Sequence, residues 1–410
     1  MQSADLASLE ARAFAGFNRL AGDMPGFGIA LSGGGDSVAL MQLAARWADQ
    51  EKRRLLVATI DHGLRAESEA EAIDAGRMAA GLGLGHHILR WRDGSGMSGN
   101  LMANARQARL RLLAGWAREQ GLPAVVVGHT RDDVAETFLM RLSRGAGIDG
   151  LAGMAARREA EGMVWLRPLL EIGRDELRDW LCHIGVSWVD DPTNQDDRFA
   201  RARVRQAMVQ LGLDAGMVAL SAANLSGVRD ALNAAMDPLL EGAAVRWGSL
   251  FLDRVAFESA AQELRRRLIL AAVRFVTGAG YPPRRAGVDH ALQALSRGVR
   301  VTLDGAVIDP GSGLLVHREP ASVNHEIYNE IWDNRWRITG LQDGEKVLPL
   351  GENVNAVDWR SAGLTHLEAQ ALPVVYRAGQ LVVPLFESCD DLHMEPVRGV
   401  TDFRRMLLGH

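Results

Sequence analysis

The feature that most constrains the fold of this chain is a glycine-rich hexapeptide, Ser-Gly-Gly-Gly-Asp-Ser, at residues 32–37. The apolar run Phe27–Leu31 precedes it, and apolar residues recur at helical spacing from Val38 to Trp47 after it. This pattern predicts a strand, a tight turn and a helix. Glycine lets the backbone approach an anion closely, and the free N–H groups at a helix N-terminus favour phosphate. We therefore expect a phosphate-binding turn here, although an ordinary tight turn would use the same glycines.

Polar side chains in the hexapeptide add to this expectation. Ser32 and Ser37 supply hydroxyl donors. A carboxylate beside phosphate groups is explained if a Mg²⁺ ion lies between them, so Asp36 is the expected metal ligand. The hexapeptide lacks the third glycine of the dinucleotide fingerprint and the Lys-Ser/Thr pair of the Walker loop, which excludes both of those motifs.

Apolar runs alternate with helical patterns over the first half of the chain. The runs Leu55–Ile60, His86–Trp91 and Ala124–Gly128 follow the first strand, with helical periodicity between them. Continuous apolar runs are typical of parallel strands that are covered on both faces. We predict an α/β fold with a doubly wound, mainly parallel sheet. The run Val164–Leu170, interrupted by Pro168, is predicted to be its last edge strand.

The chain of 410 residues is long enough for two or three domains. The strand–helix alternation predicts a first domain over residues 1–210. Residues 211–325 show Ala- and Leu-rich helical periods, with no strand expected before Val301, and predict a helical domain. Residues 330–410 predict a small β-rich domain of the α+β class, in which two apolar runs flank Arg377–Gly379 as a hairpin.

Polar side chains follow two of the predicted strands. Asp61 and His62 follow the second strand, whereas Asp132, Asp133 and Glu136 follow the fourth. Ligands bind at the carboxyl ends of parallel strands, so we expect these side chains near the hexapeptide. Asp133 and Glu136 are three residues apart and share one face of the helix that begins here. The alternatives are a polar loop without a ligand and N-terminal capping by the acids.

Arginine residues are concentrated in several places, although the net charge of the chain is −5. Arg106 and Arg109 lie on one predicted helix, Arg144 begins a glycine-rich loop, and Arg205 follows a turn. A guanidinium binds phosphate or carboxylate bidentately, so each is a candidate contact. A further group in the predicted helical domain indicates a surface that follows the phosphates of a nucleic acid. Its members are Arg265, Arg266, Arg267, Arg274, Arg284 and Arg285. A solvated helix face is the alternative for both groups.

Cysteine content and hydropathy exclude several classes of protein. The two cysteines, Cys182 and Cys389, cannot build a zinc site or an iron–sulfur cluster from cysteine alone. No apolar run approaches the ~20 residues of a membrane span, and the first residues lack the basic start of a signal peptide. We expect a cytoplasmic protein that does not act at a membrane.

The hexapeptide is similar, at every defined position, to the Ser-Gly-Gly-x-Asp-Ser loop (PP-loop) of the N-type ATP pyrophosphatases, which split ATP into AMP and pyrophosphate. Further motifs follow it over the first half of the chain. They are Asp61–Arg65, Ala105–Arg109, Gly128–Thr137, Arg144–Met154, Arg167–Leu170 and Asp191–Asn194. Together with the loop, these motifs resemble the tRNA(Ile)-lysidine synthetase family. The chain departs from the family pattern at Thr193, where Ser is usual, at Met102, where Glu is common, and at Leu110, where Tyr is common.

The resemblance implies a reaction in two steps. ATP adenylates O2 of the wobble cytidine in the CAU anticodon of an isoleucine tRNA, and pyrophosphate leaves. The ε-amine of free L-lysine then displaces AMP from C2. The residues implied for ATP are Ser32, Gly33, Gly34, Gly35, Asp36, Ser37, Asp61 and His62, with Asp36 holding Mg²⁺.

An acidic pocket can hold the lysine ammonium and then accept a proton from it. Asp133 and Glu136 are the candidates for this role, followed by Asp132. The candidate contacts to phosphate or to the lysine carboxylate are Arg106, Arg109, Arg144 and Arg205.

Two other interpretations remain open. Another ATP pyrophosphatase, such as a tRNA thiolase or a GMP synthetase, is the nearest enzyme alternative. The missing C-x-x-C argues against the cluster-dependent thiolases, and no amidotransferase domain is recognisable. A tRNA-binding protein without catalysis is the alternative from another class, and the intact Asp36, Asp133 and Glu136 argue against it.

Overall fold

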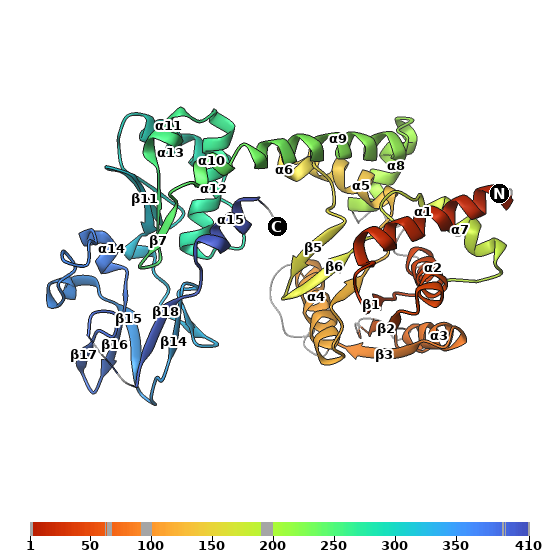
Figure 1. Cartoon of the computed structure of the whole chain (residues 1–410), viewed down its shortest axis with the longest axis horizontal. Helices are drawn as coiled ribbons and strands as arrows, with labels where there is room; N and C mark the ends of the chain where they lie inside the picture. Colours follow the sequence, from red (N-terminus) through yellow and green to blue (C-terminus); the bar gives the residue numbers. More distant parts are fainter. Residues whose placement is uncertain are drawn as a thin grey trace. The chain divides into compact units, whose positions relative to one another are not determined.

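The computed structural model describes residues 3–61, 63, 68–91, 101–189, 200–387, 389 and 391–408, and it leaves out the side chains of 3–5 and 101–106. The chain divides into two compact units, Met1–Asp230 and Ala231–His410. Figure 1 shows the helices and strands of both. The finer division into residues 1–210, 211–325 and 330–410 stays a prediction.

The first unit is built on a six-stranded sheet with the order β3-β2-β1-β4-β6-β5. All neighbouring strands in it are parallel except β5 and β6. The strands are β1 (Gly26–Ala30), β2 (Arg54–Asp61), β3 (Gly85–Arg90), β4 (Ala124–Val126), β5 (Arg157–Ala160) and β6 (Met163–Leu166). The predicted doubly wound, mainly parallel sheet is confirmed.

Helices cover both faces of this sheet, as buried parallel strands require (Figure 1). The helices of this unit are α1 (Ser3–Ala21), α2 (Gly35–Glu51), α3 (Ser68–Gly81), α4 (Leu101–Glu119), α5 (Arg131–Leu142), α6 (Ile148–Leu151), α7 (Arg174–His183) and α8 (Ala200–Gln210). One apolar cluster joins α1, α2, α3 and α7 to one face, and Phe17, Phe27 and Trp47 stack on one another within it. A second cluster joins α4 to the other face through Trp116 and Trp165.

The edge of this sheet differs from the prediction. The expectation that Val164–Leu170 forms the last edge strand is wrong, because β6 lies between β4 and β5. The true edge strand, β5, is antiparallel and joins β6 through a turn at Glu161 and Gly162, which both have positive φ. Its sequence is Arg-Arg-Glu-Ala and three of its four residues are exposed, so no apolar pattern marks it.

The second unit contains a five-stranded antiparallel sheet with the order β7-β8-β11-β10-β9. The strands are β7 (Ala244–Arg246), β8 (Ser249–Leu252), β9 (Val301–Leu303), β10 (Ala306–Pro310) and β11 (Leu314–Arg318). The helices of this part are α9 (Ala215–Ala234, which begins in the first unit), α10 (Asp237–Leu240), α11 (Arg254–Ser259), α12 (Gln262–Thr277), α13 (Arg285–Ser296) and α15 (Val400–Leu408). Phe275 of α12 and Phe403 of α15 meet edge to face in the shared core.

The expectation that no strand precedes Val301 is wrong, because β7 and β8 form a hairpin. The turn consists of Trp247 and Gly248, with φ of 53° and 72°. Asn-Gly is the usual sequence of such a turn, and a bulky residue in the left-handed region is uncommon. Trp247 stacks on Phe386, with ring centroids 5.5 Å apart, which supports the turn through packing that the local sequence does not reveal.

Two small antiparallel sheets complete the second unit, with orders β12-β13-β14-β18 and β15-β16-β17. Their elements are β12 (Ile327–Tyr328), β13 (Ile331–Trp332), β14 (Trp336–Thr339), β15 (Lys346–Pro349), β16 (Pro373–Arg377), β17 (Gln380–Val382) and β18 (His393–Pro396), with η2 (Pro320–Ser322), η3 (Gly351–Ala356) and α14 (His366–Gln370). The predicted hairpin is confirmed as β16 and β17. Buried Asp333 pairs with Arg318 of β11 and with Arg335, which ties neighbouring sheets together.

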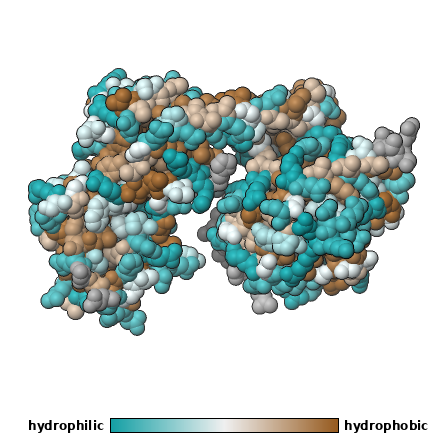
Figure 2. All heavy atoms as spheres, in the orientation of Figure 1, coloured by the Kyte–Doolittle hydropathy of each residue, from teal (hydrophilic) through white to brown (hydrophobic). Residues whose placement is uncertain are grey.

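Among the residues that the structure describes, no single helix is both long and apolar enough to cross a membrane. The helices α8 and α9 reach that length and hydropathy only when they are taken together, and the chain bends by 111° between them. Several apolar side chains are exposed here, among them Val209, Leu211, Met217 and Leu220. Figure 2 shows this apolar surface along α9.

Candidate active site

The hexapeptide forms the turn between β1 and α2, and its hydroxyl groups hold the shape of the turn. Ser37 Oγ donates to the carbonyl of Gly34 at 2.8 Å, and the N–H of Ser32 donates to Ser37 Oγ at 3.1 Å. Gly33 has a φ of 82°, in the left-handed region that glycine favours. Gly34 is the N-cap of α2, and no side chain caps this end of the helix. The start of α2 is therefore suited to an anion.

The segment after α7 contacts the glycines of this turn. The N–H of Val189 donates to the carbonyl of Gly33 at 3.1 Å. A Cβ at Gly35 would lie 3.3 Å from the indole of Trp188. Gly35 therefore leaves the space that this tryptophan needs.

The end of β4 lies directly against the start of α2. A Cβ at Gly128 would be 2.9 Å from the carbonyl oxygen of Asp36, so only glycine fits this approach. β1 and β4 are neighbours at the point where the strand order reverses, which is where α/β sheets bind ligands. The structure thus brings the polar residues after β4 to the hexapeptide, as the strand-end pattern predicts.

Arg174, the first residue of α7, connects these two segments. Its Nε donates to Asp36 Oδ2 at 3.0 Å and its Nη1 donates to Glu136 Oε1 at 3.0 Å. Its Nη2 lies 3.5 Å from Asp133 Oδ1. Burial acts to lower the pKa of Arg174, but the charges of Asp36, Glu136 and Asp133 outweigh it and raise that pKa. One guanidinium therefore stays charged between three carboxylates.

Glu136 is almost fully buried, and arginines surround its carboxylate. Besides Arg174, Arg205 Nε donates to Oε1 at 2.5 Å, and Arg201 Nε lies 3.9 Å from Oε2. Arg201 also lies 3.7 Å from Asp133. Arg201 and Arg205 are four residues apart on α8 and face the same side. We call these six side chains the arginine–carboxylate cluster: Asp36, Asp133, Glu136, Arg174, Arg201 and Arg205.

Asp132 and Asp133 also hold backbone groups. Asp133 Oδ2 accepts from the N–H of Thr130 at 2.9 Å and from its hydroxyl at 3.1 Å. Asp132 Oδ2 accepts from the N–H of Arg174 at 2.8 Å. Burial acts to raise the pKa of Asp133, but Arg174 and the Thr130 N–H outweigh it and lower that pKa. The capping interpretation therefore holds for Asp133, whereas the carboxylate of Glu136 faces arginine side chains.

His129 is a half-buried, neutral imidazole at the edge of the cluster. Arg167 Nε donates to its Nδ1 at 3.2 Å. Burial lowers the pKa of His129 to about 4, and the charges of Arg167, Arg201 and Arg109 act in the same direction while Asp133 opposes them.

His129 is expected to make stability depend on pH between about 6.5 and 4. In this window the unfolded chain binds a proton at His129 and the folded chain does not, so the free energy of unfolding falls as pH falls. Asp133 does not act in this window, because its lowered pKa matters only below the ordinary value of 3.8. The urea midpoint of a His129→Asn variant should change less between pH 7 and pH 5 than that of the unmodified protein. An exposed-histidine control, His183→Asn, should keep the full change, and equal changes in all three proteins would contradict the assignment.

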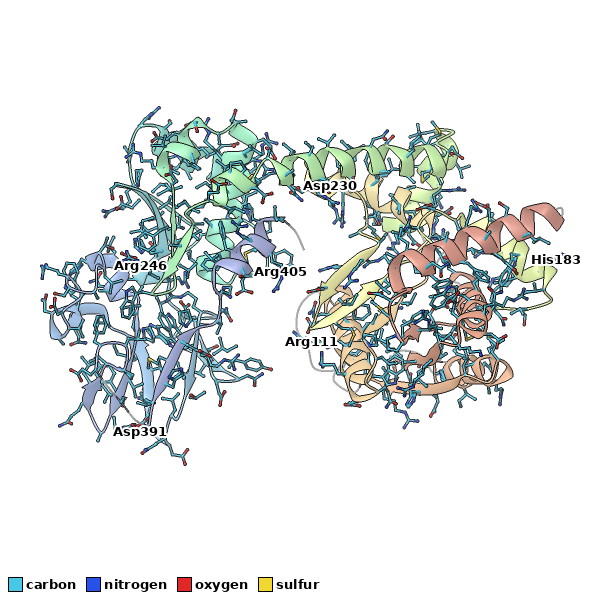
Figure 3. All side chains as sticks on the ribbon, viewed as in Figure 1. Arg111, His183, Asp230, Arg246, Asp391 and Arg405 are labelled. Carbon is cyan, nitrogen blue, oxygen red and sulfur yellow. The ribbon has the colours of Figure 1, made fainter. Side chains whose placement is uncertain are left out.

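The structure describes only some of the other predicted ligand contacts. Asp61 ends β2, and its Oδ1 accepts from the N–H of Gly63 and from the Ser68 hydroxyl. His62 and the Arg106 side chain lie outside the described residues, as do Thr193 and the rest of its motif. Arg109, on α4, is exposed, and its positive charge helps to lower the pKa of His129. Figure 3 labels Arg111 on the same helix. Arg144 is exposed in the loop after α5.

The six arginines predicted to contact RNA differ in exposure. Arg284 and Arg285 are exposed at the start of α13, where Tyr281 is also 85% exposed. Arg274 and Arg265 are half-buried, and Arg266 binds Glu263 through two nitrogens. Arg267 is buried and donates to Asn233, so its guanidinium faces the interior of the unit.

Two members of the cluster, Arg174 and Arg201, are not among the contacts predicted from the sequence. A cation in the first turn of a helix opposes the helix dipole, and this mismatch at the start of α7 is the signal that could have identified Arg174. The pairing of Arg201 with the acids of α5 depends on how α8 packs. An apolar contact of Ala135 with Met208 and Val218 sets that packing, and the local sequence does not indicate it.

The residues present fit a magnesium ion. Asp36 Oδ2 is bound to Arg174, but its Oδ1 is buried and has no hydrogen-bond partner among the described residues. A buried carboxylate oxygen without a partner is costly unless a cation binds it. Mg²⁺ commonly takes one or two carboxylates together with substrate phosphates. Asp36 supplies such a carboxylate beside a turn that is suited to an anion.

Comparisons with known proteins find a matching family model and several relatives. A family model described as a PP-loop domain matches residues 11–211. The tRNA(Ile)-lysidine synthase of Ruegeria pomeroyi is 41% identical over 399 residues, covering 93% of this chain and 94% of that protein. The tRNA(Ile)-lysidine synthase of Brucella anthropi is 34% identical and covers 93% of this chain and 90% of that protein. Among solved structures, the U34-tRNA thiolase NcsA from Methanococcus maripaludis has a TM-score of 0.46 and 18% identity, covering 54% of this chain and 76% of that one.

Proposed function

The chain belongs to the tRNA(Ile)-lysidine synthetase (synthase) family of ATP-binding ligases, and from that premise we propose that it attaches free L-lysine to C2 of the wobble cytidine in the CAU anticodon of an isoleucine tRNA. ATP first adenylates O2 of that cytidine with release of pyrophosphate, and lysine then displaces AMP. The reaction takes place in the cytoplasm in this proposal.

One observation carries the proposal: a single guanidinium, that of Arg174, contacts the hexapeptide acid Asp36 and the α5 acids Asp133 and Glu136. The two chemical steps need a phosphate site and an amine site that meet at one carbon atom. The hexapeptide supplies the phosphate site, and the α5 acids supply a buried negative pocket. Because Arg174 contacts acids of both, the phosphate site and the amine site are separated by the width of one arginine side chain.

In the first step, the start of α2 and the hydroxyl of Ser32 bind the phosphates of ATP, while Ser37 holds the shape of the turn. Dipoles and donors fixed in this way stabilise the negative charge that develops on departing pyrophosphate. Asp36 would hold Mg²⁺, and the ion would supply positive charge to neutralise the same phosphates.

In the second step, Glu136 receives the ε-ammonium of lysine. A free lysine amine has a reference pKa of about 10.4 and must lose a proton before it attacks. Glu136 accepts that proton in this proposal, because the carboxylate of Asp133 is committed to the N–H and hydroxyl of Thr130. Asp132 is committed to the backbone of Arg174.

The anticodon base must leave its stack to reach this site, and proteins read RNA most readily in unpaired loops. We propose that exposed arginines of the second unit hold the tRNA by its phosphates. Arg284 and Arg285 are the best placed, since Tyr281 beside them can stack on a base.

Removing both exposed arginines, as Arg284→Gln with Arg285→Gln, should weaken tRNA binding and make it less dependent on salt. Each arginine that no longer neutralises a phosphate lowers the slope of log K against log salt by about 0.7 to 0.9. Filter binding over a series of KCl concentrations measures this slope. The control is Arg297→Gln with Arg360→Gln, two exposed arginines elsewhere in the unit that give the same change of net charge. Equal slopes in the two double variants would contradict the assignment.

The experiment that tests the function is transfer of labelled lysine to RNA. The full chain is incubated with ATP, Mg²⁺, labelled L-lysine and either the isoleucine tRNA or the methionine tRNA with the same CAU anticodon. Label in the isoleucine tRNA alone is expected. Pyrophosphate exchange without lysine transfer would indicate another nucleophile, and tRNA binding without either signal would indicate a protein that binds without catalysis.

A further inference from the structure

The six side chains of the arginine–carboxylate cluster have equal numbers of positive and negative groups without a ligand. Its three carboxylates, Asp36, Asp133 and Glu136, pair with three guanidinium groups. The Glu136 side chain is 2% exposed and the Arg174 side chain is 14% exposed, so solvent screens these charges weakly. His129 beside them is neutral, and Arg167 adds another cation. A lysine ammonium that enters this cluster therefore meets acids that already have counter-charges.

A magnesium nucleotide would change this balance. ATP remains a net anion when it carries one Mg²⁺, and the hexapeptide would hold it next to Asp36. Arg174 contacts both Asp36 and Glu136, so a charge placed beside Asp36 acts directly on the group that neutralises Glu136. Attraction of the guanidinium groups to phosphate leaves net negative charge at Glu136. A lysine ammonium then has an unsatisfied carboxylate to bind.

We propose that Arg174 is a positioning residue that makes lysine binding conditional on bound nucleotide. This inference rests on the proposed function, because it assumes that ATP and lysine share this cluster. Coupling between two ligands is reciprocal, so lysine must strengthen nucleotide binding by the same factor. The consequence for the reaction is an order of binding in which the nucleotide comes first.

A purely structural role for Arg174 gives a different result. Loss of a structural arginine lowers stability and weakens both ligands, but it leaves unchanged the ratio of lysine affinities with and without nucleotide. That ratio is therefore the diagnostic measurement.

The test is calorimetric titration of the full chain with L-lysine, with and without saturating Mg²⁺ and α,β-methylene-ATP, which cannot be cleaved at the bond that the reaction breaks. We expect the nucleotide to raise lysine affinity by at least about 5-fold, the lower end of typical coupling. In Arg174→Gln the cluster has one uncompensated carboxylate, so lysine should bind without nucleotide and the ratio should fall towards 1. Arg174→Lys keeps the charge and should keep most of the coupling. Arg19→Gln, which breaks an exposed ion pair with Glu171 in the same unit, should behave as the unmodified protein.

Equal lysine affinity with and without nucleotide in the unmodified protein would overturn the inference, and so would an unchanged ratio in a folded Arg174→Gln variant. Should Arg174→Gln fail to fold, Arg205→Gln removes a different counter-charge from Glu136 and should lower the ratio in the same way. The lysine-transfer assay with tRNA, run on the same samples, separates the two proposals. Transfer without coupling overturns only the order of binding, whereas absence of transfer overturns the proposed function itself.

Discussion

An Asp36→Asn variant is expected to lose ATP–pyrophosphate exchange by at least about 100-fold, the cost of removing one preorganised electrostatic contact to a developing charge. Asparagine keeps the shape of the side chain and an oxygen, but it removes the negative charge that holds Mg²⁺. The buried Oδ1, which has no hydrogen-bond partner among the described residues, then becomes a weak ligand or an amide nitrogen. Exchange is measured with tRNA present over a range of Mg²⁺ concentrations.

The exchange assay also has a pH dependence with a defined sign. Burial raises the pKa of Asp36, against the opposing effect of Arg174. The carboxylate therefore takes up a proton at a higher pH than an ordinary aspartate, and Mg²⁺ binding weakens as pH falls. The apparent affinity for Mg²⁺ in the unmodified protein should drop on acidification, and this drop should be absent in Asp36→Asn.

A matched control for this variant is Asp74→Asn, which makes the same chemical change on the surface of α3 in the same unit. It should keep exchange within about 2-fold and leave the Mg²⁺ dependence unchanged, since substitutions at exposed sites have small effects. Near-normal exchange in a folded Asp36→Asn variant would remove Asp36 from the metal site.

A Glu136→Gln variant is expected to separate the two steps. Lysine transfer should fall by at least about 100-fold, because general-base catalysis contributes that much or more. Pyrophosphate exchange should stay within a few fold, since the hexapeptide and Asp36 are intact. Glutamine also leaves Arg174 and Arg205 with less counter-charge, so the urea midpoint should fall as well. Both assays are run on variants that remain folded at the assay temperature.

The comparison with Asp133→Asn shows whether the base has been assigned correctly. Asp133 caps α5 through Thr130, so its loss should cost about 1 kcal/mol of stability and affect both steps alike. If lysine transfer falls further below pyrophosphate exchange in Asp133→Asn than in Glu136→Gln, the base is Asp133 instead.

The parts of the site that sequence could predict are those set by short-range rules. The hexapeptide between Phe27–Leu31 and Val38 obeys strand, turn and helix periodicity, and the acids after β4 fall where parallel strands end. Both statements need only the chain within about ten residues of each position. These rules predict the parallel sheet and the reversal of strand order between β1 and β4, and both are present in the structure.

The parts that sequence could not predict depend on contacts between distant segments. Arg174 reaches Asp36 across 138 positions of the chain, and no local pattern links them. The Trp247–Gly248 turn is stable because Phe386 stacks on it, and β5 has a polar sequence because its residues are mostly exposed. In each case tertiary packing overrides the local signal.

The balance of charges in the arginine–carboxylate cluster also affects how these residues can change during evolution. A single substitution that removes one acid or one arginine leaves a poorly solvated charge behind, whereas loss of an acid together with an arginine restores neutrality. The loss of stability therefore opposes single substitutions at these positions, even where the reaction is no longer under selection. In lineages that abandon this chemistry, the acids and the arginines should disappear in pairs, and the glycines of the turn can outlast them.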